Sequence, residues 1–258
     1  MRSTNPVLTR TDFGLNQYAP PADQFNGSWY APPMTQRMTL ADVVSKTSGL
    51  FLVLVATAIA SAMIIPIQFL MGATIVCSLA AFVTSIVVAG RRKVSLPGVL
   101  AFTIFEGVFV GGFSKLFELL YPGIVVQAVL GTFMAAAATF IAYRFGNVRV
   151  RGRLARIVTI AVFAYAGVAL VNLVMLLFGT NLGIFNIGPS AGMLSWLAAG
   201  IGVVLAVASL VMDFDEVDRG IRMGAPAQES WRAAFGLMVT MVWLYTQILR
   251  IASFFYRD

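Results

Sequence analysis

One stretch of the chain reads IVTIAVFAYAGVALVNLVMLLF over residues 157–178 and carries no charged side chain. A helix of this length covers about 30 Å, which is the thickness of the hydrocarbon core of a bilayer. Similar apolar blocks recur along the chain, separated by short connections that hold most of the charged residues. Such continuous runs differ from the short alternating segments of a membrane β-barrel. The sequence therefore predicts an all-α fold, a polytopic bundle of membrane helices.

The composition excludes several classes of protein. Of the 258 residues, 59% are hydrophobic and 11% are charged, far from the proportions of soluble domains. The chain has no histidine, which removes His-based triads and His-ligated zinc, and its single cysteine, Cys77, cannot form an intramolecular disulfide. The formal charge of +7 is spread over short connections instead of one patch. We therefore expect no enzyme, no cofactor and no nucleic-acid partner, but a lipid bilayer around the chain.

Two regions are predicted. Residues 1–38 are polar, contain two Pro-Pro pairs and lack periodicity, so they are expected to form a disordered cytoplasmic tail. Residues 39–258 are expected to form a transmembrane domain of seven helices, the first starting at the capping-box spacing of Thr39 and Asp42. The predicted spans are 48–66, 70–90, 98–118, 123–143, 157–178, 193–213 and 231–255.

The basic residues predict the orientation of these spans. They gather at 91–93 and at 144–156, whereas the alternate connections hold Lys115 or no basic residue. Because loops rich in Lys and Arg stay in the cytoplasm, both segments are expected on that side. The leader and the connection with Arg219 and Arg222 fall on the same side, which predicts an N-in, C-out topology.

Ionisable groups inside a bilayer are costly, so the few in these spans are the candidate functional residues. Glu106 lies about 12 Å into the third span, counted from Gly98. Its carboxylate would handle cations or protons, or else bond to a neighbouring helix. Gln247 and Arg250 are three residues apart and share a helix face in the seventh span. We expect Arg250 to pair with Glu106 or Asp213, unless it snorkels to the membrane surface.

The sixth span ends in an acidic run, Asp213-Phe-Asp-Glu-Val-Asp218. Carboxylate clusters suit hard cations such as calcium, but the run lacks the spacing of an EF-hand loop, and no metal is assigned to it. Asp213 directly follows apolar residues and is the first candidate for a buried titrating group. Asp218 is expected to be solvated.

Four segments together resemble the Bax inhibitor 1 family of seven-helix membrane proteins, in its bacterial branch. The resemblance runs from about Leu40 to Tyr256. The segments are FEGVFVGG at 105–112 followed by Phe117-Glu118, YPGIVVQAVLGT at 121–132, LVMDFD at 210–215 and VWLYTQILR at 242–250. The first of them also contains Gly107-xxx-Gly111, a pattern of close helix packing.

The resemblance implies a bundle with a central last helix, located in the bacterial inner membrane as a multi-pass protein. It also implies a pH-sensitive calcium leak, in which carboxylates on helices six and seven form a pair. Asp213 matches the helix-six carboxylate, with Asp215 as the alternative register, and Gln247 takes the helix-seven position. Since an amide does not titrate, any leak is expected to depend on pH weakly, or over a more acidic range than in relatives with both carboxylates. Arg91 or Arg92 matches the arginine of helix two that the family uses as an alternative partner.

Two functions are therefore expected. The first is a channel through which cations, calcium or protons, leak past the intramembrane carboxylates. The second is a non-conducting regulator that binds a membrane protease or a stress-response partner, which the polar tail and Gln247 favour. Ion flux in liposomes separates the two.

Overall fold

The computed structural model of the chain describes residues 37–91, 93–146, 148–150 and 152–256. Over these ranges it contains seven helices, all long and apolar enough to cross a membrane. This confirms the predicted all-α membrane bundle. The helices are α1 (Leu40–Ile64), α2 (Ile67–Gly90), α3 (Leu96–Leu120), α4 (Ile124–Arg144), α5 (Arg153–Leu177), α6 (Met193–Arg222) and α7 (Glu229–Phe254).

The helix ends follow local sequence signals. The hydroxyl oxygen of Thr39 accepts a hydrogen bond from the amide of Asp42 at 3.2 Å, which satisfies one of the free N–H groups of the first turn of α1. Ser95 caps α3 in the same way, with Pro97 in the first turn. The predicted start of the first helix is therefore confirmed.

The sixth helix is longer than the predicted span 193–213, because it continues through the acidic run to Arg222. Two ion pairs at i,i+4 spacing support this extension, and two arginines in the last turn suit the helix dipole. Hydropathy does not detect the part of a helix that extends beyond the apolar layer, because that part consists of charged residues. Because the acidic run is helical, its carboxylates project from different faces of α6.

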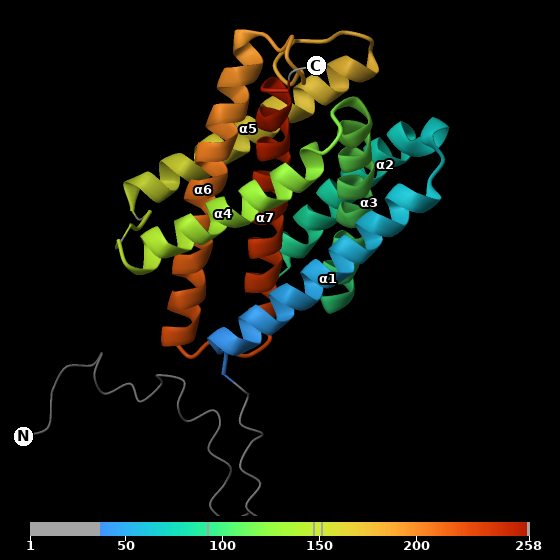
Figure 1. Cartoon of the computed structure of the whole chain (residues 1–258). Coiled ribbons are helices and arrows are strands. Elements are labelled where there is room, and N and C mark those ends of the chain that lie inside the picture. The colour runs from blue at the N-terminus through green and yellow to red at the C-terminus, as the bar shows by residue number, and fades with distance from the viewer. Residues whose placement is uncertain (1–36, 92, 147, 151, 257–258) are drawn as a thin grey trace, which may run out of the picture. The chain divides into compact units, whose positions relative to one another are not determined.

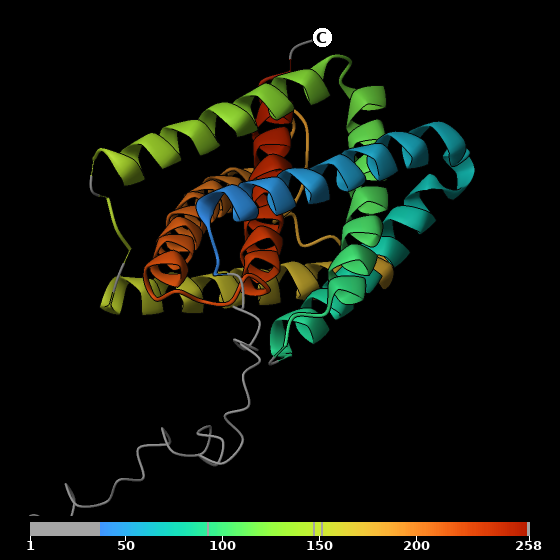
Figure 2. The ribbon, with the colours of Figure 1, turned by 90° about the horizontal axis from the view of Figure 1, so that it is seen from below.

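The central helix is α7, as the resemblance implied. It packs against α1, α3, α4 and α6, and Figure 2 shows it among the other helices. In Figure 1, α1 and α4 cross α7 on the side that faces the viewer, with α5 on the far side. The α5 helix packs mainly on α6 and leaves most of its apolar surface exposed, as expected for a helix that faces lipid.

The basic connections meet at one end of the bundle. The amide of Met38 donates to the carbonyl of Ala225 at 2.7 Å, and Arg232 donates to the carbonyl of Arg91 at 3.2 Å. Arg149, in the connection between α4 and α5, reaches α6. We call this the basic end, formed by the described residues of 37–46, 91–95, 144–156 and 219–232, which leave out 92, 147 and 151. The predicted grouping of these segments is confirmed, whereas the side of the membrane on which they lie stays a prediction.

The predicted tail, residues 1–38, lies almost wholly outside the described residues. Its last two residues are described, and both contact the bundle. Arg37 pairs with Pro226 in an isolated bridge, and Met38 is buried against Val43 and Val217. The polarity of the neighbouring sequence concealed this contact, which attaches the start of the bundle to the turn between α6 and α7.

The two glycines of the predicted packing pattern do bring helices close together. A β-carbon at Gly107 would lie 2.8 Å from the carbonyl oxygen of Leu54, and one at Gly111 would overlap the carbonyl of Ala58 and the hydroxyl of Ser61. Both clashes are with α1. The backbones of α1 and α3 therefore approach closely because these positions have no side chain.

Candidate functional site

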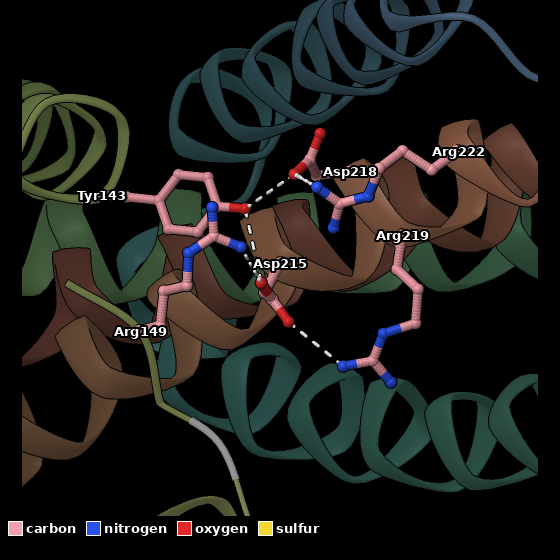
Figure 3. Close-up of polar contacts among 6 residues, drawn as sticks. All are labelled: Tyr143, Arg149, Asp215, Asp218, Arg219 and Arg222. Atoms are coloured by element: carbon pink, nitrogen blue, oxygen red, sulfur yellow. Dashed lines mark hydrogen bonds and ion pairs between the residues drawn. The ribbon is translucent and has the colours of Figure 1, made fainter. Parts of the chain in front are cut away.

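Asp215 is the most extensively bonded carboxylate of the acidic run. Its residue is 2% exposed, and its two oxygens accept from Arg149 Nη1 at 3.2 Å and from Arg219 Nη2 at 3.1 Å. A buried carboxylate is tolerated when it is paired and hydrogen-bonded in this way. Figure 3 shows the two guanidinium groups reaching Asp215 from the α4–α5 connection and from α6 itself.

Tyr143 and Asp218 extend this network. The Tyr143 hydroxyl lies 3.5 Å from Asp215 Oδ1 and 3.3 Å from Asp218 Oδ2, so its proton is shared between two carboxylates. Asp218 also pairs with Arg222 at 2.8 Å and is partly exposed, in keeping with its predicted solvated position. Arg149 lies over the Tyr143 ring, with 5.5 Å to the centroid. The network joins the end of α4, the α4–α5 connection and α6 at the basic end (Figure 3).

Asp213 lies two residues earlier on α6 and faces a different helix. Its carboxyl group is next to the Thr240 hydroxyl of α7, and a β-carbon at Gly236 would lie 3.8 Å from Asp213 Oδ1. The second oxygen, Oδ2, is buried and has no hydrogen-bond partner among the described residues. An unsatisfied carboxylate oxygen between two membrane helices is costly, and such groups are concentrated at functional sites.

Glu106 is the second intramembrane carboxylate and belongs to α3. It is half-buried, and its carboxyl group makes no hydrogen bond or ion pair with any described residue. Thr103, one turn before it, contacts Met238 Sδ on α7 at 3.7 Å. Asp213 lies beside Gly236 and Thr240, so Thr103 of α3 and Asp213 of α6 contact neighbouring turns of α7.

Arg250 and Gln247 form a second polar cluster toward the opposite end. Arg250 is 4% exposed and donates from Nη1 to Gln247 Oε1 at 3.0 Å and to the Tyr165 hydroxyl at 3.4 Å. It donates from Nη2 to the Ile184 carbonyl at 3.3 Å and lies 4.8 Å from the centroid of the Phe185 ring. The shared helix face of Gln247 and Arg250 is thus confirmed.

The predicted acidic partner of Arg250 is wrong, and so is the alternative that Arg250 snorkels. Among the described residues, its partners are all neutral oxygens and a ring face. Neither Glu106 nor Asp213 reaches it. The sequence analysis considered only carboxylates as partners. It missed the hydroxyl group of α5 and the backbone carbonyl of the following loop, whose oxygens accept the hydrogen bonds instead.

The predicted pairing of Gln247 with Asp213 is also wrong. Gln247 contacts α6 at Gly202, where a β-carbon would lie 2.7 Å from its Oε1. Because α6 and α7 are antiparallel, residues equally far from their shared turn face each other. Asp213 lies about 14 Å before the end of α6, whereas Gln247 lies about 27 Å along α7. The α7 positions beside Asp213 are Gly236 and Thr240, so Gln247 is no replacement for a partner carboxylate.

Of the two arginines predicted as alternative partners, Arg91 does not reach either carboxylate. Arg91 is exposed, directly follows α2, and forms no ion pair with a described carboxylate. Arg92 lies outside the described residues. The arginines that do bind the α6 carboxylates are Arg149, Arg219 and Arg222, which the sequence analysis used only as markers of topology. Tyr143, Tyr165 and Thr240 were missed as well, since tyrosines and threonines are common packing residues in membrane helices.

A substitution at Arg250 tests the assignment of neutral partners. Arg250→Met keeps most of the side-chain volume and leaves the bond from Tyr165 to Gln247, 3.0 Å long, in place. Its cost in stability is expected to be about 1 kcal/mol or less, because a desolvated charge disappears with the lost bonds. Arg250→Ala leaves a cavity and is expected to cost about 2 kcal/mol more. Thermal unfolding in detergent measures both, and equal losses would show that an essential charge had been removed.

The described residues contain no group of three or more His, Cys, Asp and Glu side chains arranged to hold a metal ion.

Comparison with known proteins identifies the family of the chain. The family model described as Bax inhibitor 1 like matches residues 5–257, almost the whole length. No curated protein matches the chain.

Proposed function

The chain belongs to the Bax inhibitor 1 like family of membrane proteins, and on that premise we propose that it is a cation-leak channel. The proposed path follows α7 and passes the carboxylates of Glu106 and Asp213. Calcium and protons are the proposed permeant ions, and the function is transport without catalysis.

The observation that carries this proposal is the unpaired oxygen of Asp213 between α6 and α7. Structural ion pairs in membrane helices are normally completed by a partner, as Asp215 is by its arginines. A carboxylate that keeps one oxygen free inside the protein is available to bind a passing cation. The carboxyl group of Glu106 on α3 also has no partner among the described residues, and we propose it as a second such position.

A further polar group lies on the α6 face of α7, where Gln247 contacts Gly202. The hydroxyl of Tyr245, two residues earlier, lies on the opposite face and bonds to that of Ser114 on α3 at 2.7 Å. Hydroxyl and amide oxygens can replace part of the hydration shell of a cation in transit. Arg250 lies beside Gln247, and its positive charge would limit the passage of cations, which suits a slow leak more than a fast pore.

The Asp215 network is proposed to hold the path closed at the basic end. Arg149 belongs to the α4–α5 connection, and its ion pair attaches that connection to α6 beside Asp213. Loss of the pair would free the connection to move. We place the basic end in the cytoplasm of a bacterial cell, because the positive-inside rule applies to the segments gathered there.

Calcium entry into liposomes that contain the purified protein tests the proposal. Asp213→Asn and Glu106→Gln remove a charge without a change of size, and each is expected to lower the entry rate about tenfold, which corresponds to about 1.4 kcal/mol in the barrier. Glu216→Gln is the matched control, since Glu216 is on the same helix but exposed, and should behave as the parent does. Parental rates in both path variants would contradict a path along these carboxylates.

The alternative is a non-conducting regulator of a membrane partner, and one observation favours it. Met38 packs against Val217 and Ile221, so the segment that leads into α1 contacts the helix of the candidate site. A partner bound to the leader could act on α6 through this contact. Parent protein without calcium entry above empty liposomes, together with a partner that co-purifies only when residues 1–36 are present, would favour this function.

A further inference from the structure

An apolar groove runs along one side of the bundle. Its volume is about 580 Å³, and its lining residues come from α1, α3, α4 and α7. The α1 and α4 helices form its two walls and do not pack against each other. Both lie on the same side of α7 in Figure 1 and Figure 2. The floor is α3 and α7, where Val242 is 4% exposed, whereas the rim residues Met63 and Val126 are 79% and 64% exposed.

The groove has the length of a lipid chain. Its α1 wall extends from Phe51 to Met63, which is about 18 Å along a helix. This is more than half of the hydrocarbon thickness of a bilayer, and close to one leaflet. Because the walls are membrane helices and the rim is exposed, the groove opens to lipid. An acyl chain of the bilayer could therefore lie in it along the helices.

The groove ends at a cation. Lys115 lines it near the end opposite to the basic end, and its Nζ donates to the carbonyl oxygens of Ala62 at 2.6 Å and Ile65 at 3.3 Å. An ammonium group has three N–H donors, so one remains for a further acceptor. Lys115 forms no ion pair with a described residue. The nearby Glu118 is engaged by the backbone amides of Gly123 and Val125 at the start of α4.

We propose that this groove binds one phospholipid of the bilayer, with an acyl chain between α1 and α4 and the phosphate on Lys115. The apolar side chains of the groove contact the acyl chain, and the Lys115 ammonium group at its end binds the phosphate through a charge-assisted hydrogen bond. The lining of the groove includes Ser114 and Tyr245 but neither Asp213, Glu106 nor the Asp215 network, and the proposal does not depend on ion conduction.

Native mass spectrometry of the full chain tests it. Delipidated protein is mixed with micelles of equal amounts of phosphatidylglycerol and phosphatidylethanolamine, and the phospholipid retained per protein is counted. Val129→Trp fills the groove, whereas Leu130→Trp adds the same group on the outer face of α4 as a matched control. The parent and Leu130→Trp should retain one phospholipid, and Val129→Trp should lose it. Val55→Trp with Leu52→Trp repeats the comparison on α1, in case one variant does not fold.

Removal of the charge tests the headgroup. Lys115→Gln should weaken phospholipid retention about tenfold, as expected for a lost charged hydrogen bond. Inorganic phosphate, added alone, should neither bind nor displace the lipid, because the chain supplies most of the affinity. Equal retention by Val129→Trp and Leu130→Trp, unchanged retention by Lys115→Gln, or displacement by inorganic phosphate would each overturn the proposal.

Discussion

Gly111→Leu is expected to lower the stability of the bundle by about 3 kcal/mol or more, or to prevent its folding. Even a β-carbon at this position would overlap Ala58 and Ser61 of α1, and part of that clash is with backbone, which cannot rotate away. The helices would have to separate, and α1 would lose its contact with α3. Thermal unfolding in detergent, followed by size-exclusion chromatography, measures the loss.

The matched control is Gly167→Leu on α5. Gly167 is also inside a membrane helix, but nothing lies within 4 Å of a β-carbon there. Leucine forms helices better than glycine by about 1 kcal/mol, so the control should be as stable as the parent or more so. If both variants unfold alike, close packing at Gly111 is not what holds α1 in place.

Asp215→Asn is expected to raise calcium entry about tenfold, opposite in sign to Asp213→Asn two residues away. It removes the charge that holds Arg149, and a closed state weakened by about 1.4 kcal/mol gives a tenfold larger open fraction. The side chains of Arg149 and Arg219 are 30% and 57% exposed. The energy assigned to the ion pair is therefore set well below the cost of breaking a fully buried pair. Liposome flux at equal protein content measures the change.

Asp218→Asn is the control for this prediction. Asp218 also accepts from Tyr143 and pairs with an arginine, but its side chain is 42% exposed, and it makes no bond to the described part of the α4–α5 connection. Loss of the Asp218 charge should change the flux less than twofold, because exposed ion pairs contribute little free energy. A slower leak in Asp215→Asn would show that this carboxylate belongs to the path and does not close it.

The helices and their grouping could be predicted because a bilayer strongly constrains the sequence of a spanning helix and of its connections. A spanning helix needs about 20 apolar residues, and basic loops favour one side, so seven spans and one basic end follow from local composition. Gly107 and Gly111 were recognisable by their spacing. The extension of α6 to Arg222 was not, since its last turns lie outside the apolar layer.

The pairing of side chains could not be predicted in the same way. Asp213 and Gln247 were matched by family motifs, without counting residues from the turn between α6 and α7, which would have placed Asp213 near residue 238. The partners of Arg250 include a backbone carbonyl of the α5–α6 loop, and no sequence pattern marks such a contact. Arg149 was visible as a basic residue, but only the fold brings it to Asp215.

The most direct measurement of the proposed function is calcium entry into liposomes with the parent protein, compared with the Asp213→Asn, Glu106→Gln double variant at equal protein content. If cations pass these two carboxylates, the parent conducts, and the double variant falls to the rate of empty liposomes although it remains folded. A parent no faster than empty liposomes, or a folded double variant as fast as the parent, would contradict a cation path along α7.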